Sequence, residues 1–191
     1  MMAIRFGIAR GLFTNESGLG SAPIVDAAAV TRNPVRQGLI AMTGVFWDTV
    51  IVCALTGLVL VSSILRNPDG MSGLSGGALS SAAFANIPVV GPIVLTVGLI
   101  CFAWSTILGW SYYGERCWVY LCGQKAIMPF RIIYTLVVFV GSVMTLDAVW
   151  GIADILNASM AFPNLVALLG LSGVIAVSYT HLRAHETSAH L

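Results

Sequence analysis

The chain has 191 residues, of which 58% are hydrophobic and only 9% are charged, and its mean hydropathy is +0.91. Soluble domains carry roughly a quarter charged residues, so this composition predicts an integral membrane protein. The formal net charge of +1 leaves no basic patch that could neutralise phosphates, which excludes nucleic acid from the expected partners.

The beginning of the chain combines a helical pattern with a polar run that is rich in glycine. Residues 1–7 lack the basic region, apolar stretch and cleavage site of a signal peptide, so we expect the chain to start inside a larger protein. The run Ala9–Pro23 contains three glycines together with an arginine, an asparagine and a glutamate. Such a segment is costly beside apolar helices unless it lines a cavity or meets water. The pair Gly7 and Gly11 permits close packing of backbones.

Four apolar stretches are long enough to cross a bilayer, which requires about 20 residues. We expect these spans at residues 38–65, 89–113, 130–147 and 149–176. A link rich in glycine and serine, residues 66–88, separates the first two spans and is long enough to hold a short helix near residues 78–85. The remaining links, residues 114–125 and the corner near Asp147, are short.

The placement of lysine and arginine indicates which side of the membrane each link faces. With alternating links, six basic residues fall on one side and Arg66 alone falls on the other. The six are Arg10, Arg32, Arg36, Arg116, Lys125 and Arg131. Because such residues gather on the cytoplasmic side, we expect the segment before the first span to be cytoplasmic and the link 66–88 to be external.

Three aspartates lie in the expected spans or at their ends, where ionisable groups are functional candidates by default. Asp147 lies at a helix end, where an acidic side chain is inexpensive, and this favours a structural role. Asp48 lies well inside the first span, and its position is equally compatible with a functional and a structural role. Asp154 lies near the start of the fourth span, which also contains Pro163.

Two adjacent hydroxyl residues, Ser105 and Thr106, lie in the middle of the second span. Hydroxyl oxygens, together with backbone carbonyls of broken helices, are suitable ligands for a hard cation such as Na⁺. The alternative is that both hydroxyls donate hydrogen bonds to carbonyls of their own helix, which is common. The aromatic residues that follow, Trp110, Tyr112 and Tyr113, are typical of the membrane interface.

Neither an enzyme nor a transition-metal site is expected from the residues present. The three histidines lie in the last eleven residues, and the four cysteines have neither zinc nor redox spacing. Residues 177–191 break the apolar pattern and resemble translated sequencing-adapter sequence, so we expect this tail to be non-native and the natural chain to differ after about Ala176. His181 and His185 have helical i,i+4 spacing, which leaves a zinc site as the alternative for the tail.

Several long motifs occur in one order between about residues 3 and 176. They are Ala9–Pro23, Asn33–Gly38, Ser105–Arg116, Asp154–Asn157 and Met160–Leu168. Together they resemble the sodium:alanine symporters, also called the alanine or glycine:cation symporter family. An ordered series of this kind is more specific than any single motif.

The resemblance implies an all-α membrane fold, similar to the LeuT-type transporters with their inverted repeats and broken helices. This chain then corresponds to the second half of one transporter, with a half-helix at residues 4–12 followed by about four transmembrane helices. Ser105 and Thr106 fall where transporters of this fold place a hydroxyl pair on a sodium ion. The residues of the polar turn then have structural or gating roles. They are Asn15, Glu16, Gly18 and Gly20.

The function implied by the resemblance is Na⁺-coupled symport of a small neutral amino acid, such as alanine or glycine, by a multi-pass protein of the plasma membrane. Na⁺ is the expected coupling ion, and the expected partners are this amino acid, the lipid bilayer and the missing N-terminal half, which holds most of the substrate site. The alternative is a small structural membrane subunit, which the polar run Ala9–Pro23 fits poorly. A channel would require rings of polar residues along one face, and the spans lack that pattern. A membrane enzyme would require a titratable cluster at one depth, whereas the aspartates are scattered.

Overall fold

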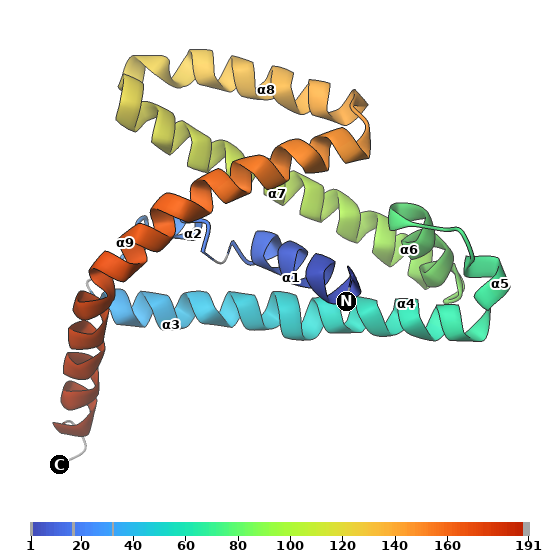
Figure 1. The fold of residues 1–191 in the computed structure, drawn as a ribbon, viewed down its shortest axis with the longest axis horizontal. Helices are drawn as coiled ribbons and strands as arrows, with labels where there is room; N and C mark the ends of the chain where they lie inside the picture. Colours follow the sequence, from blue (N-terminus) through green and yellow to red (C-terminus); the bar gives the residue numbers. More distant parts are fainter. Residues whose placement is uncertain (1, 17, 32, 189–191) are drawn as a thin grey trace. The chain divides into compact units, whose positions relative to one another are not determined.

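The computed structural model describes residues 2–16, 18–31 and 33–188, and every regular element in these ranges is helical (Figure 1). Within these ranges, four helical segments are long and apolar enough to cross a membrane. They are Pro34–Arg66, Val90–Cys122, Gln124–Val143 and Leu146–His181. A helix satisfies its own backbone hydrogen bonds in lipid, which explains why the apolar parts of the sequence fold in this way.

The first of two compact units comprises Met1–Val45 and Glu115–Leu191. Its elements are α1 (Met2–Thr14), α2 (Ala22–Asp26), α3 (Pro34–Val45), the end of α7, the 3-10 helix η2 (Gln124–Ala126), α8 (Ile127–Val143) and α9 (Leu146–Ser188). Within this unit α3 lies against α9. Asn33 begins α3, because its side-chain oxygen accepts hydrogen bonds from the N–H groups of Val35 and Arg36 at 3.0 and 3.2 Å.

The second compact unit comprises Phe46–Gly114. Its elements are the π-helix η1 (Phe46–Cys53), α4 (Ala54–Arg66), α5 (Pro68–Met71), α6 (Gly76–Ala85) and most of α7 (Val90–Cys122). The short helix expected near residues 78–85 is confirmed as α6, which packs against α4 (Figure 1). At this contact the hydroxyl of Ser63 donates to the carbonyl of Ala83 at 3.4 Å, and both residues are buried.

The link expected at residues 114–125 is helical for most of its length, and the place where the membrane span ends stays a prediction. α7 continues past Gly114 to Cys122 and ends before Gly123, whose φ of +80° suits glycine. Continuing the helix keeps the backbone bonded and brings Glu115 within reach of α8, where the Arg131 side chain donates to its carboxylate at 2.7 Å. At the next corner Asp147 falls in the first turn of α9, where a negative charge complements the helix dipole.

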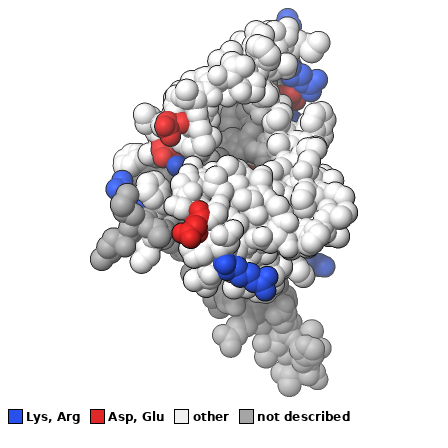
Figure 2. All heavy atoms as spheres, turned by 90° about the vertical axis from the view of Figure 1, so that its right-hand side faces the viewer, with Lys and Arg blue, Asp and Glu red and all other residues white. Residues whose placement is uncertain are grey.

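Apolar side chains cover most of the surface of both units. Among the residues that the structure describes, the buried hydrophobic ones are Leu19, Met71 and Ala83. Figure 2 shows a face on which the charged side chains are few and separated by wide uncharged areas. Such a surface suits contact with lipid or with further helices rather than with water.

The turn between α6 and α7 leads to a stability prediction. Gly91 lies so close to the backbone of Phe84 that a Cβ atom at position 91 would collide with the Phe84 carbonyl oxygen. We expect Gly91→Ala to destabilise the protein by about 1–3 kcal/mol, because the two backbone segments must separate. Thermal unfolding of the purified protein in detergent measures the change.

Gly98→Ala is the matched control for this prediction. Gly98 lies in the same helix, and no atom lies within 4 Å of the Cβ that alanine would add. Alanine is also a better helix former than glycine, so the midpoint temperature of unfolding should stay the same or rise. Equal midpoints for the two variants would contradict the close approach at Gly91.

Candidate functional site

A cluster of charged and aromatic side chains joins α1 to the start of α9 in the first unit. Arg10 donates two hydrogen bonds to the carboxylate of Asp154, at 3.0 and 3.3 Å. The same guanidinium lies over the ring of Trp150, with its central carbon 3.8 Å from the ring centroid. Phe13 meets Trp150 edge to face at a centroid distance of 5.9 Å. The planar guanidinium can bind a carboxylate through two N–H groups and stack on an indole at the same time, which lysine cannot reproduce.

The ion pair with Asp154 removes Arg10 from the basic residues that indicate the orientation of the chain in the membrane. Asp154 lies eight residues after Leu146, which is about 12 Å along the axis of α9. The start of the fourth span was expected on the external side, whereas Arg10 was expected in a cytoplasmic segment. Because Arg10 pairs with a side chain about two turns into α9, it does not lie in a loop. Its charge therefore does not indicate which side of the membrane the beginning of the chain faces. The other five basic residues still outnumber Arg66.

α1 ends in a tight turn that contains the polar residues predicted to have structural or gating roles. The N–H of Asn15 donates to the carbonyl of Gly11 at 3.0 Å, and the N–H of Glu16 donates to the carbonyl of Phe13 at 3.1 Å. Glu16 has a φ of +51°, a left-handed conformation that glycine or asparagine usually supplies at the end of a helix. The side-chain oxygen Oε2 of Glu16 is enclosed and has no hydrogen-bond partner within the described ranges.

The glycines of this turn have different surroundings. Gly18 and Gly20 have φ values of +79° and +82°, so both use conformations that other residues rarely adopt. Gly18 has open space around it, whereas a Cβ on Gly20 would lie 3.0 Å from Oδ1 of Asn164 on α9. Among the residues of the first unit whose burial the structure describes, the buried ones are Leu19, which is 8% exposed, and Ser21, which is 4% exposed. The turn is therefore packed closely against α9.

The expected sodium ligands lie in the second unit. Ser105 is fifteen residues after Val90, which is about 22 Å along α7 and close to its middle. Both Ser105 and Thr106 are exposed. The hydroxyl of Ser105 donates to the carbonyl of Phe102 at 3.0 Å, which is the structural alternative considered for this residue. Further oxygen ligands would have to approach the pair from its exposed side.

Asp48 lies in the π-helix η1, a feature that the sequence did not predict. Helical turns of this type are rare and occur frequently at functional sites, because they widen the helix locally. The oxygen Oδ2 of Asp48 is enclosed, and the described part of the chain offers it no hydrogen-bond partner. Asp48 therefore stays a candidate functional residue, and no ligand is proposed for it.

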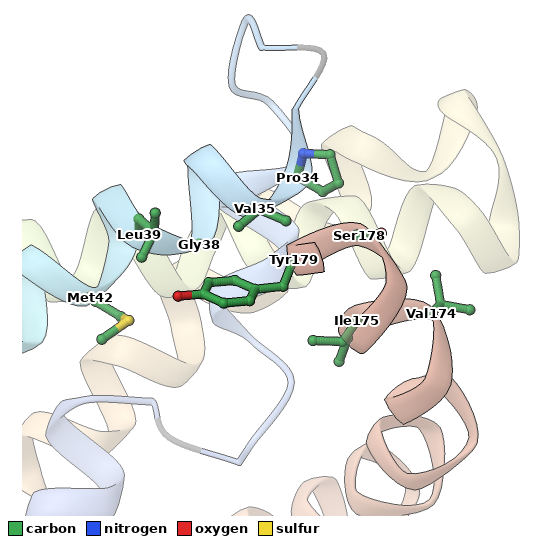
Figure 3. Close-up of a pocket in the computed structure, with 9 residues that line it drawn as sticks. All are labelled: Pro34, Val35, Gly38, Leu39, Met42, Val174, Ile175, Ser178 and Tyr179. Atoms are coloured by element: carbon green, nitrogen blue, oxygen red, sulfur yellow. The ribbon is translucent and has the colours of Figure 1, made fainter. Parts of the chain in front are cut away.

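The described part of the chain contains apolar hollows in each unit. In the first unit a hollow of about 400 Å³ lies between α3 and the second half of α9. Figure 3 shows the residues that line it, with the Tyr179 hydroxyl directed toward Met42. In the second unit α4, α6 and α7 surround a hollow of about 630 Å³. Neither lining includes a charged side chain, so neither offers the ionic partners that a zwitterionic amino acid requires.

Sequence reasoning missed ion pairs within the described ranges, among them Arg10 with Asp154 and Arg131 with Glu115. Each arginine had been counted as a cytoplasmic loop charge, and Asp154 had been noted alone. The signal was present, because a charge in or near a span usually has a partner. Choosing that partner required the helix packing, since Arg10 and Asp154 are 144 residues apart.

Comparison with known proteins identifies the family. The sequence model of the sodium:alanine symporter family matches residues 1–190. The chain is 52% identical over 187 residues to a sodium/alanine symporter of Methanococcus maripaludis, covering 96% of this chain and 41% of that protein. It is 54% identical to an uncharacterized transporter of Haemophilus influenzae, covering 92% and 38%. It is 34% identical to a probable sodium/glutamine symporter of Bacillus subtilis, covering 91% and 36%.

The extent of these matches bears on the boundaries of the chain. The chain spans about two fifths of the length of these relatives. The family match continues past Ala176 to residue 190, and α9 continues to Ser188. Neither observation marks a boundary at Ala176, and the non-native origin of residues 177–191 stays a prediction.

The family match and the structure agree on the class of protein. The match includes the polar turn after α1 and all four helices that are long and apolar enough to cross a membrane. These helices make the chain a multi-pass protein of the cell membrane, and its relatives are transport proteins rather than enzymes. The chain belongs to the sodium:alanine symporter family.

Proposed function

We propose that this chain is the C-terminal part of a Na⁺-coupled symporter for small neutral amino acids such as alanine or glycine. The family match over residues 1–190 carries the proposal. Relatives named for sodium together with alanine or glutamine support Na⁺ as the coupling ion and an amino acid as the cargo. The chain spans about two fifths of these relatives. In the LeuT-type arrangement proposed below, a broken helix of the N-terminal part supplies most of the substrate site.

The fold proposed for the complete transporter is the LeuT-type inverted repeat, of which this chain forms the second half. α1 is then the cytoplasmic half of a broken helix, and the four long apolar helices complete the repeat. The short helices α5 and α6 form the external loop between the first two of these helices. The support is the order of the elements, a short helix with a polar turn followed by four long ones.

The proposed sodium site uses the hydroxyls of Ser105 and Thr106. Both lie at the middle of α7, at the depth where broken helices of such transporters offer backbone carbonyls to an ion. The hydroxyl of Ser105 now bonds to Phe102, and because its oxygen keeps a free lone pair it can still coordinate Na⁺. Sodium and the amino acid favour the same conformation in this mechanism, so each raises the affinity for the other by the same factor.

The polar turn after α1 has the gating role in this proposal. Asn15 and Glu16 close the last turn of the half-helix, and Gly18 and Gly20 allow the chain to leave it in a compact path. The pair of Arg10 with Asp154 holds the half-helix on α9 while the turn moves.

The sodium site leads to a prediction about transport. We expect the double variant Ser105→Ala with Thr106→Ala to weaken the apparent affinity for Na⁺ by roughly tenfold or more, since two oxygen ligands are lost. The measurement is alanine uptake against Na⁺ concentration, with the complete transporter that contains this chain reconstituted in vesicles.

Thr135→Ala is the control, because Thr135 lies within α8 and its hydroxyl bonds to the carbonyl of Arg131 in its own helix at 2.8 Å. Alanine uptake by the Thr135→Ala variant should depend on Na⁺ concentration as it does in the unsubstituted transporter. If the double variant also keeps the original sodium dependence, Ser105 and Thr106 are not ligands. Uptake that is absent or indifferent to sodium in the unsubstituted transporter rejects the symporter function itself.

The ion pair between α1 and α9 leads to a second prediction. Arg10→Gln and Asp154→Asn should each destabilise the protein, and the double variant should be less unstable than the sum, with a coupling of about 1 kcal/mol. The reason is that either single change leaves the other charge without its partner. Thermal unfolding in detergent measures all four proteins.

Arg36→Gln combined with Asp154→Asn is the comparison cycle. Arg36 is an exposed residue of α3, and the changes should add to within about 0.5 kcal/mol, as expected for independent sites. Additive behaviour in the Arg10 cycle as well would show that the pair does not hold α1 in place.

A further inference from the structure

The end of α1 is held in a conformation that its residue type does not favour. The hydrogen bonds from Asn15 and Glu16 back into α1 place Glu16, with its φ of +51°, in the left-handed position that ends the helix. A Cβ is crowded in this conformation, which is why glycine usually takes it. Glutamate is instead a good former of the right-handed helix. The local sequence therefore favours a longer α1 than the one observed.

Two enclosed polar atoms make the same turn less favourable still. Oε2 of Glu16 and Oγ of Ser21 have no hydrogen-bond partner in the part of the chain that the structure describes. Ser21 is 4% exposed, so little water reaches its side chain. An enclosed oxygen without a partner is less stable than the same oxygen in water. A rearrangement that exposes both oxygens would remove this cost.

We propose that the end of α1 is a two-state switch controlled by the backbone of Glu16. In the short state, which is the one described, α1 ends at Thr14 and Glu16 is left-handed. In the long state Glu16 adopts right-handed dihedral angles and α1 extends toward Gly18 by up to about one turn. Gly18 ends the longer helix, because glycine readily takes the conformation that a helix end requires.

The switch is connected to α9 through Gly20. Oδ1 of Asn164 lies 3.0 Å from the place of a Cβ on Gly20, and the neighbouring Leu19 is also buried. Because these residues fit closely in the short state, a change at Glu16 must disturb their contact with α9. The length of α1 is thus linked to its attachment to α9. The use of this switch in gating rests on the proposed function, whereas the switch itself does not.

The test measures the exposure of Ser21 in the complete transporter in vesicles. Ser21→Cys is introduced after all native cysteines of the transporter, including the four of this chain, are replaced by serine. The rate at which the introduced cysteine reacts with a membrane-impermeant maleimide, supplied on both faces, is then followed. Glu16→Gly removes the crowding of the left-handed conformation and should slow the reaction by roughly two- to fivefold. Gly20→Ala should speed it by a similar factor, because alanine disfavours the short state through its φ and through Asn164.

Glu16→Gln is the matched control, since it removes the charge and keeps the backbone preferences of a straight side chain. The labelling rate of this variant should stay close to that of the transporter in which Glu16 is unchanged. A change as large as that of Glu16→Gly would mean that the charge controls the turn, and would overturn the proposal. Equal rates for Glu16→Gly and Gly20→Ala would overturn it as well.

Two further measurements keep the test decisive. If Gly20→Ala does not reach the membrane, Glu16→Val replaces it, because a β-branched residue at a φ of +51° disfavours the short state and should likewise speed the reaction. Sodium-driven alanine uptake is measured on the same vesicles, and Glu16→Gly should lower its maximal rate. Absence of uptake in the unsubstituted transporter would contradict the proposed function, while the labelling rates would still decide whether the switch exists.

Discussion

The bilayer offers no hydrogen-bond partner to a peptide group, so each segment that enters it must satisfy its backbone internally. This constraint explains why 58% hydrophobic composition becomes an all-helical structure, with α7 extending over Val90–Cys122 and α9 over Leu146–Ser188. It also makes each departure from the regular α-helix informative. Within the described ranges, the departures with enclosed polar atoms that have no hydrogen-bond partner are the turn after α1 and the π-helix around Asp48.

The charged groups of the structure follow the same constraint. Arg10 bonds to Asp154 and stacks on Trp150, so that a guanidinium close to apolar helices keeps both ionic and aromatic partners. Arg131 and Glu115 join α8 to the end of α7 in the same manner. These pairs hold α1 and α8 against their neighbours. The turn after α1 instead has a left-handed glutamate and enclosed oxygens for which the described residues offer no partner.

The elements that could be predicted were those with a strong local signal. The apolar runs indicated four membrane helices, and the length of the glycine- and serine-rich link 66–88 indicated the short helix found as α6. The helical structure of residues 114–122 was not predicted, because Glu115 and Arg116 look like interfacial charges in isolation. A contact with Arg131 of α8, which follows only from packing, keeps Glu115 inside a helix. The π-helix at Asp48 was not predictable either, because no local motif specifies it.

The sequence by itself determined the family, the membrane class and the approximate place of each span, since these depend on composition, ordered motifs and runs of apolar residues. Tertiary structure alone decided which charges pair, because Arg10 and Asp154 are 144 residues apart and meet only when α1 lies on α9. It also decided that Glu16 is left-handed and that Gly20 lies against Asn164. Backbone conformation at a turn is set by the contacts on both sides of it, and those contacts come from distant parts of the chain.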